Sequence, residues 1–365
     1  MSDTYRSAGV DYDVLDPAKR HALTASAATS PLLEARGGRA IDASRGEPAF
    51  LFEVAGRTYA QVLECLGTKS VLAREVQHEI GLQRFDAVAY DSVAAIVNDL
   101  GCVGAAPLVV NAYFATGSAE FYADQERFTS LVDGWQRACE DAGAVWGGGE
   151  SPTLSGLIHA ADIELAGSAV GLVPEGHEGI TGQALAPGDD IVLVAATGLH
   201  ANGASLARRL AGDMSEGYAT ELPSGRTFGD ALLDPAPVYS RIVERVLGAG
   251  GELTYVSHIT GHGFRKLMRA DRDLGYVLDV LLPVPEVLAF MVERLGLSDE
   301  EAYGTFNMGA GYALYCPPSS TAVVLDVCAE LGFDAQRAGR VVEGPRRLEI
   351  TPLGVTYRDD SYSAR

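Results

Sequence analysis

Hydrophobic and polar positions follow regular periods from residue 48 onwards, and the period changes several times along the first half of the chain. The helical spacing of Val93, Ile96, Val97 and Leu100 predicts a helix over 86–101. A second helix is expected over about 125–141. Short apolar or alternating segments predict strands; they are 49–56, 58–64, 107–115, 144–146 and 162–173. Residues 1–45 are polar and poor in strand signals, and the segment 29–46 is typical of a mobile loop.

The second half restarts the alternation after residues 174–189, which hold Pro and Gly and show no strong period. We therefore expect an N-terminal domain over 1–175 and a C-terminal domain over 185–365. Strands are expected here at 190–196, 275–283, 312–316, 337–344 and 348–351. Helices are expected at 204–210, 237–248, 264–269, 285–296 and 319–332. Strands and helices are mixed in both halves, which predicts an α/β or α+β fold with two domains.

Composition supports a folded enzyme-sized chain and excludes several function classes. The 365 residues are 47% hydrophobic, enough for sizeable cores. Lys and Arg number 28 against 49 Asp and Glu, a net charge of −21. That charge argues against duplex DNA and anionic membranes as partners. The start of the chain lacks the pattern of a signal peptide, no apolar run reaches 18 residues, and the five Cys form no CxxC, so we expect a cytoplasmic protein.

Glycine and lysine point to candidate chemistry. The chain holds 42 Gly but only three Lys, so a Lys in a Gly-rich stretch is notable. In the first half, the loop Glu64-Cys65-Leu66-Gly67-Thr68-Lys69 combines a carboxylate, exposed backbone N–H groups, a hydroxyl and an ammonium, which suits phosphate. Asp91, Ala95 and Asp99 share one stripe of the helix over 86–101, where two carboxylates across a small residue leave room for a cation. The turn 147–151 (GGGES) adds a further carboxylate.

The second half contributes three polar, Gly-rich junctions at the ends of elements. They are 197–203 (TGLHANG), 258–263 (HITGHG) and 305–309 (TFNMG). Ligand sites in α/β proteins gather at such junctions. Each junction also has an ordinary structural explanation as a turn or helix start. Taken together, they favour a metal–nucleotide site in one half facing a substrate site in the other.

These motifs, in this order, resemble the phosphoribosylformylglycinamidine cyclo-ligase family, also called aminoimidazole ribonucleotide synthetases. The resemblance begins at residues 5–11 (YRSAGVD) and continues through GTK, VNDL, GAAPL, YFATG, GGGES, GLHANG, HITGHG and TFNMG to RVVEG. It covers nearly the whole chain. It implies two α/β domains, with the N-terminal domain forming a dimeric β-barrel. It also implies a cytoplasmic homodimeric ligase of purine biosynthesis that closes the imidazole ring with ATP and Mg²⁺, with K⁺ as a further candidate.

Position by position, the resemblance assigns roles to residues of this chain. Lys69, Asp99, His200 and His258 are the expected catalytic residues. Glu64, Asp99 and Glu150 are the expected magnesium ligands. The residues expected to bind ATP or substrate are Gly67, Thr68, Lys69, Asn98, Gly148, Gly149, Asn202, Gly203, Thr260, Gly261 and Asn307.

The chain also departs from the family's motifs. ECLGTK stands where the family has a DGVGTK-like loop, GGESPTLSG where it has GGETAEMPG, and HITGHG where it has HITGGG. These changes leave two alternatives open. One is a paralogous ATP-dependent enzyme acting on a related small substrate. The other is a catalytically silent nucleotide-binding homologue.

Overall fold

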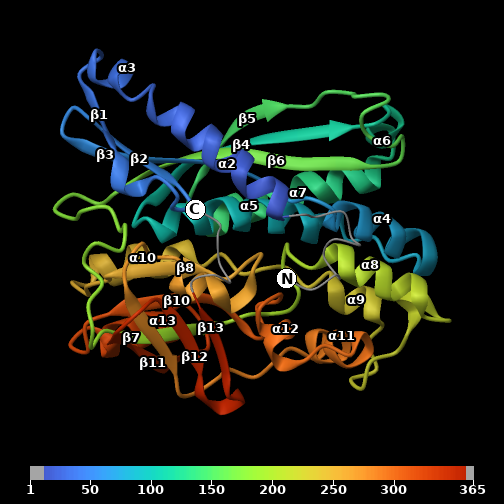
Figure 1. The fold of residues 1–365 in the computed structure, drawn as a ribbon. Helices are drawn as coiled ribbons and strands as arrows, with labels where there is room; N and C mark the ends of the chain where they lie inside the picture. Colours follow the sequence, from blue (N-terminus) through green and yellow to red (C-terminus); the bar gives the residue numbers. More distant parts are fainter. Residues whose placement is uncertain (1–11, 359–365) are drawn as a thin grey trace.

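The computed structural model describes residues 12–358, so the motif at 5–11 lies outside the described part of the chain. The first half forms a six-stranded sheet in the order β1-β2-β3-β6-β4-β5 (Figure 1). Its strands are β1 Gly38–Ile41, β2 Phe50–Val54, β3 Arg57–Cys65, β4 Ala106–Thr116, β5 Val145–Glu150 and β6 Ile163–Leu172. Its helices are α2 Tyr12–Ala27, α3 Pro31–Glu34, η1 Asp42–Ser44, α4 Lys69–Ile80, α5 Phe85–Cys102, α6 Glu120–Ala123 and α7 Gln125–Ala142.

The second half forms a seven-stranded sheet in the order β13-β12-β9-β11-β7-β10-β8. Its strands are β7 Asp190–Ala195, β8 Tyr255–His258, β9 Leu274–Leu278, β10 Ala310–Cys316, β11 Ala335–Glu343, β12 Arg347–Ile350 and β13 Val355–Arg358. Its helices are α8 Ala204–Asp213, η2 Gly217–Ala219, α9 Phe228–Leu232, α10 Ser240–Gly248, η3 Gly263–Met268, α11 Glu286–Leu295, α12 Asp299–Tyr303, α13 Thr321–Glu330 and η4 Thr351–Leu353. Within residues 12–358, no helix is both long and apolar enough to cross a membrane.

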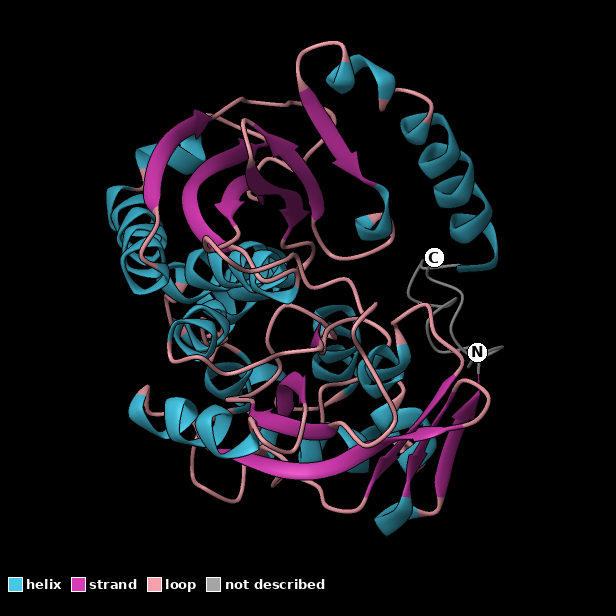
Figure 2. Cartoon of the chain, turned by 90° about the vertical axis from the view of Figure 1, so that its left-hand side faces the viewer, coloured by secondary structure: helices cyan, strands magenta, loops and turns pink. Residues whose placement is uncertain are grey.

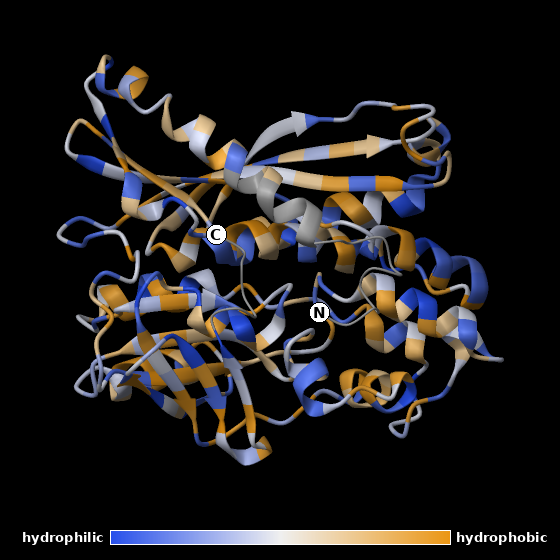
Figure 3. Cartoon of the chain, in the orientation of Figure 1, coloured by the Kyte–Doolittle hydropathy of each residue, from blue (hydrophilic) through white to orange (hydrophobic). Residues whose placement is uncertain are grey.

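The first sheet is covered on one face by α5 and α7 (Figures 1 and 2). Every second residue of β6 from Ile163 onwards is buried, as expected for a strand with one face toward a core. Hydrophobic residues gather where α5 lies against this sheet, whereas the outer helix α4 is largely hydrophilic (Figure 3). α5 is thus the central helix of the molecule, because it also contacts α10 and β8 of the second half.

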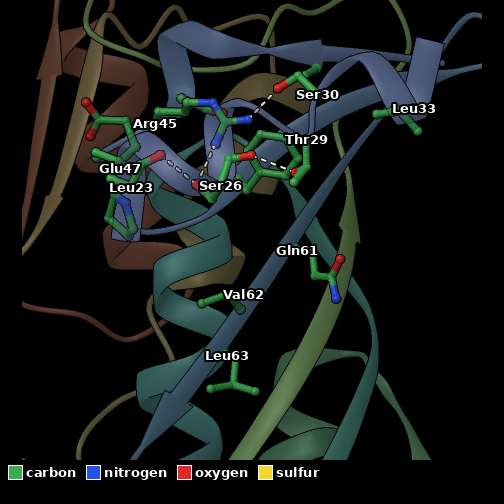
Figure 4. Close-up of a pocket in the computed structure, with 15 residues that line it drawn as sticks. Leu23, Ser26, Thr29, Ser30, Leu33, Arg45, Glu47, Gln61, Val62 and Leu63 are labelled. Atoms are coloured by element: carbon green, nitrogen blue, oxygen red, sulfur yellow. Dashed lines mark hydrogen bonds between the residues drawn. The ribbon is translucent and has the colours of Figure 1, made fainter. Parts of the chain in front are cut away.

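The N-terminal helices form an arm beside β1 to β3. A cavity of about 460 Å³ lies between this arm and the sheet, with Leu63 among its lining residues (Figure 4). The Arg45 guanidinium donates hydrogen bonds to Ser26 Oγ at 3.1 Å and to Ser30 Oγ at 2.6 Å. These bonds fix the arm to the loop that precedes β2.

The mixed α/β architecture is confirmed, and most expected elements are present. The mobile loop expected over 29–46 is wrong, because α3, β1 and η1 occupy that segment and α2 precedes it. The strand expected at 144–146 instead continues through the glycines to Glu150, because β4 pairs with it in parallel. The helix expected at 264–269 is the 3₁₀ helix η3, and α4 begins directly at Lys69, where only a loop was expected.

The two halves are joined by polar side chains of α5 that bond to backbone groups of the second half. Asn98 Oδ1 accepts hydrogen bonds from the backbone N–H groups of Tyr239 at 2.6 Å and Ser240 at 3.1 Å, and its Nδ2 donates to Pro237 O at 2.9 Å. This amide therefore satisfies N–H groups at the start of α10, which have no partner within their own helix. Two turns earlier on α5, Asp91 accepts from Ala236 N at 2.6 Å.

Asp91 also forms an ion pair with Lys69, and both side chains are fully buried. Breaking such a pair leaves a buried charge without compensation. We expect Asp91→Ala and Lys69→Met each to lower the free energy of unfolding by about 3–5 kcal/mol. The double variant should lose at least about 2 kcal/mol less than the sum of the single losses. Urea denaturation followed by tryptophan fluorescence measures all three values.

The exposed pair of Arg39 and Glu53, whose side chains are 63% and 37% exposed, is the matched control. Its coupling energy in the same double-mutant cycle should stay below about 1 kcal/mol. Additive losses at Lys69 and Asp91 would contradict the assignment of a buried, coupled pair.

Candidate active site

A cavity of about 350 Å³ lies between the two halves and gathers many of the candidate residues. The first half contributes Glu64 from the end of β3 and Ala95 and Asp99 from α5. The second half contributes the loop after β8 and the loop before α8. The candidate residues that line the cavity are Glu64, Asp99, Asn202, His258, Thr260 and Gly261, and further polar or charged lining residues are Glu47, Cys65, His262, Lys266 and Arg269.

Two carboxylates and a histidine lie together in this cavity. His258 Nδ1 lies 2.8 Å from Asp99 Oδ1. Burial alone would raise the pKa of Asp99, but the hydrogen bond and charge of His258 hold that pKa below its ordinary value. Burial raises the pKa of Glu64 to about 7, and its hydrogen bond with Asp99 and the repulsion from that carboxylate contribute. Near neutral pH, Glu64 is therefore partly protonated beside an ionised Asp99.

Two cations face these carboxylates. The Lys266 ammonium donates a hydrogen bond to Thr260 Oγ1. Burial and the neighbouring Arg269 lower the pKa of Lys266 to about 8, against the opposing attraction of Asp99 and Glu64. Arg269 itself donates to Gly46 O at 2.8 Å. The charges of Lys266 and Arg269 act to lower the pKa values of Glu64 and Asp99.

Two of the expected catalytic residues lie beneath the cavity and do not line it. Lys69 is fully buried in its ion pair with Asp91. The two carboxylates on the same side of α5, Asp91 and Asp99, therefore differ in their contacts, and of the two only Asp99 lines the cavity. His200 is buried beside it, and Thr197 N donates to His200 Nε2 at 3.2 Å. Burial, reinforced by the charge of Lys69, lowers the pKa of His200 well below its ordinary value, so this imidazole is neutral.

Three further candidates hold loops in place. Asn98 binds the start of α10, as described above. Asn307 Nδ2 donates to Gly198 O at 2.8 Å, and its Oδ1 accepts from Gly309 N, so it fixes the loop that carries Asn202. Gly203 precedes α8 with a φ of +98°. The side-chain amides of Asn98 and Asn307, which we expected to bind ATP or substrate, therefore form hydrogen bonds within the protein.

The remaining candidates lie elsewhere. Glu150, Gly148 and Gly149 are exposed on the edge strand β5. Across the sheet, Glu150 pairs with Tyr113 of β4, Tyr113 pairs with Ala166 of β6, and Ala166 pairs with Cys65 of β3. Cys65 is the neighbour of Glu64, so three strand pairings separate Glu150 from this position. Three strand spacings are roughly 14 Å. The structure therefore brings Glu64 and Asp99 together but not Glu150. Among residues 12–358, no group of three His, Cys, Asp or Glu side chains is arranged to hold a metal.

Gly67 and Thr68 lie at the start of α4, outside this cavity. Thr68 Oγ1 is 3.0 Å from Ser205 Oγ of α8. Thr68 lines a second cavity of about 660 Å³ between α4 and α8, where Arg208 pairs with Glu75 at 2.6 Å. The Gly-Thr-Lys segment thus links the two halves.

Comparison with known proteins places this geometry in a family. Residues 46–173 match the AIR synthase related protein, N-terminal domain, and residues 186–350 match the AIR synthase related protein, C-terminal domain. The chain belongs to the AIR synthase related family. A phosphoribosylformylglycinamidine cyclo-ligase of Methanothermobacter thermautotrophicus is 31% identical over 349 residues, covering 95% of this chain and 96% of the relative.

Solved structures share the fold of this AIR synthase related chain. HypE in a HypE–HypF complex superposes with a TM-score of 0.62 at 17% identity, over 86% of this chain and 92% of that one. AaThiL, solved with AMPPCP and TMP, superposes with a TM-score of 0.56 at 14% identity, over 86% of this chain and 90% of that one. At these identities the similarity concerns the fold.

One departure from the family motif has a backbone consequence. His262, which stands where the AIR synthases have Gly in HITGGG, has a φ of +75°. That left-handed conformation disfavours a side chain. The next residue, Gly263, must remain glycine, because a Cβ there would lie 2.2 Å from Tyr303 O. The strained His262 places an imidazole at the cavity.

Sequence reasoning missed Glu47, Lys266 and Arg269 of this cavity. Lys266 was discoverable, because it is one of three lysines and follows a Gly-rich loop. Glu47 was not, since it lies directly after the segment interpreted as a loop and belongs to no motif. Its carboxylate accepts a hydrogen bond from Tyr255 of the second half at 2.9 Å.

Glu64 should make the stability of the free protein fall as the pH rises. In the folded state the pKa of Glu64 is about 7, against an ordinary value of 4.5, so the folded protein binds the proton of Glu64 more tightly than the unfolded chain does. The resulting contribution to folding stability is complete below pH 4.5 and is lost as the pH rises through 7. Without metal or nucleotide, the melting temperature should therefore fall more between pH 5 and 8 in the wild type than in Glu64→Gln. Glu126→Gln, at an exposed position, is the control. Equal slopes in the wild type and Glu64→Gln would refute the raised pKa of Glu64.

Proposed function

We propose that this protein catalyses the ATP-dependent ring closure of formylglycinamidine ribonucleotide to aminoimidazole ribonucleotide, with release of ADP and phosphate. The supporting observation is that a named cyclo-ligase aligns with 95% of the chain at 31% identity. The cavity between the two halves, with Asp99 and His258 at its centre, is consistent with such a reaction. ATP binding is supported by the solved relatives of the same fold that hold ATP or its analogues.

The chemistry requires activation of a poor leaving group. The formyl oxygen of the substrate takes the γ-phosphoryl group of ATP, which releases ADP. The neighbouring amidine nitrogen then attacks the activated carbon, loses a proton, and expels phosphate as the C–O bond breaks. This sequence needs positioning and charge neutralisation more than a protein nucleophile. A polar cavity lined by both halves can supply both.

His258 is the proposed group for proton removal. His258 Nδ1 lies 2.8 Å from Asp99 Oδ1, so a neutral imidazole that donates to this carboxylate has Nε2 as its acceptor. A base oriented by a carboxylate in this way is a common arrangement for proton transfer. Thr260 and Asn202, from the two adjacent loops, are available to orient the substrate.

The donor set of the cavity fits Mg²⁺. Magnesium prefers oxygen ligands and is often bound by one or two carboxylates together with substrate phosphates. Glu64 and Asp99 are such a pair, whereas Glu150 is too distant to join them. When bound, the ion would reduce the repulsion between these carboxylates and the negatively charged phosphate groups.

A turnover assay tests the function. The purified protein, given ATP, Mg²⁺, K⁺ and formylglycinamidine ribonucleotide, should form aminoimidazole ribonucleotide, and omission of K⁺ shows whether that ion is required. Asp99→Asn should lower kcat/KM by at least about 100-fold with the melting temperature nearly unchanged. Asp133→Asn, at an exposed site on α7, is the matched control.

Absence of product with nucleotide still bound would reject ring closure and favour a silent homologue or a paralogue with another substrate. Wild-type activity in Asp99→Asn would reject the role given to Asp99.

We further propose that the face of the first sheet opposite α5 and α7 binds a second copy of this chain. α5 and α7 cover one face, and the other face exposes Leu63 by 76% and Val145 by 65%. The strand register places both side chains on this face, since Leu63 lies opposite Ser168 in the ladder and Val145 lies opposite Val109. Large exposed apolar residues on one sheet face are typical of protein contacts.

Sedimentation velocity should show twice the chain mass for the wild type. Leu63→Asp should shift the protein to the monomer, because a charge cannot be buried unpaired in an apolar contact. Leu157→Asp changes a residue that is 83% exposed but lies between β5 and β6, and it should remain dimeric. A monomeric wild type, or a dimeric Leu63→Asp, would contradict the proposed face.

A further inference from the structure

The lysine assigned to phosphate by the Gly-Thr-Lys motif cannot reach the cavity in this chain. Lys69 has no exposed side-chain surface, and its ammonium is paired with Asp91. Asp91 is held in turn by the backbone of Ala236 at 2.6 Å. Moving Lys69 toward a ligand would leave Asp91 as an isolated buried charge, at a large cost in stability.

Lys266 occupies the position that Lys69 does not reach. It lines the cavity together with Glu64, Asp99 and His258. Its backbone belongs to η3, which directly follows the strained turn at His262. An ammonium has three N–H donors. One donates to Thr260 Oγ1, and no carboxylate among the described residues comes within ion-pair distance of the other two. Lys266 therefore retains donors for a ligand inside the cavity.

The surroundings of Lys266 keep its position well defined. Thr260 anchors the ammonium from the loop after β8. Arg269, on the same segment, is anchored separately to Gly46 O, so it does not compete for the space beside Lys266. The carboxylates of Glu64 and Asp99 attract Lys266 from the opposite half without pairing with it. The cation thus lines the same cavity as the proposed magnesium ligands.

We propose that Lys266 binds a phosphoryl group in this cavity, in the place of Lys69. The inference rests on the proposed function, since it names a residue that handles the phosphate of that reaction. Glu64 and Asp99 would hold Mg²⁺, which would neutralise phosphate charge, and the Lys266 ammonium would donate charge-assisted hydrogen bonds to a phosphoryl group in the same cavity. Two sources share this chemistry: the γ-phosphate of ATP and the 5′-phosphate of the ribonucleotide substrate.

Calorimetric titrations of the full chain with Mg²⁺-AMPPCP, Mg²⁺-ADP and ribose 5-phosphate test the proposal. Lys266→Met should weaken AMPPCP binding by about 10- to 100-fold, the loss expected for one charge-assisted hydrogen bond. ADP affinity should change by less than about threefold, because ADP lacks the γ-phosphate. Lys266→Arg should recover part of the AMPPCP affinity. If ribose 5-phosphate affinity falls in place of AMPPCP affinity, Lys266 binds the substrate phosphate, which supports the phosphoryl role and identifies its source.

Arg265→Met is the matched control. Arg265 is the preceding residue of η3, and its guanidinium donates to Gly304 O at 2.6 Å, away from the lining of the cavity. This variant should bind all three ligands as the wild type does, and melting temperatures show that each variant is folded.

Unchanged affinities in Lys266→Met, or a wild type that binds neither AMPPCP nor ribose 5-phosphate, would overturn the proposal. A wild type that binds these ligands through Lys266 but closes no imidazole ring would instead reject the proposed function alone.

Discussion

The structure depends on the polar side chains by which α5 joins the two halves. Asp91 and Asn98 lie two turns apart on this helix and accept or donate hydrogen bonds to backbone groups between Ala236 and Ser240. Buried amide and carboxylate groups are costly unless they are satisfied, so these contacts require one relative position of the halves. Because Lys69 neutralises Asp91, the first turn of α4 is tied to the same position.

The cavity is a direct result of this arrangement. Asp99 follows Asn98 on α5 and therefore points toward the second half just where β8 ends at His258. In the family motif VNDL, Asn98 therefore joins the two halves, whereas its neighbour Asp99 lines the cavity. A similar division holds at the loop before α8, where His200 is buried and neutral while Asn202 lines the cavity.

Periodicity predicted α5, α7, β4 and β6 well, because each has a clear apolar face or run. It failed for α2, α3 and β1, where no strong apolar stripe marks the elements and tertiary contacts such as those of Arg45 hold them. For the site, motif order predicted Asp99, His258 and Thr260 beside one another. It could not show that Lys69 pairs with Asp91, since both residue types fit a ligand site equally well. The position of Lys266 depends on how η3 packs, and that information is absent from the local pattern.

The buried Lys69–Asp91 pair also bears on how this architecture can change over generations. One partner belongs to α4 and the other to α5, and the backbone that completes their bonding belongs to the other domain. A gene segment encoding either half alone would therefore yield a chain that exposes these normally buried polar groups to water and loses the hydrogen bond between Asp91 and Ala236. Recombination that exchanged one half for a distant homologue's would succeed only if the segment from Ala236 to Ser240 presented the same backbone groups. These contacts thus restrict which N-terminal and C-terminal domains can be combined.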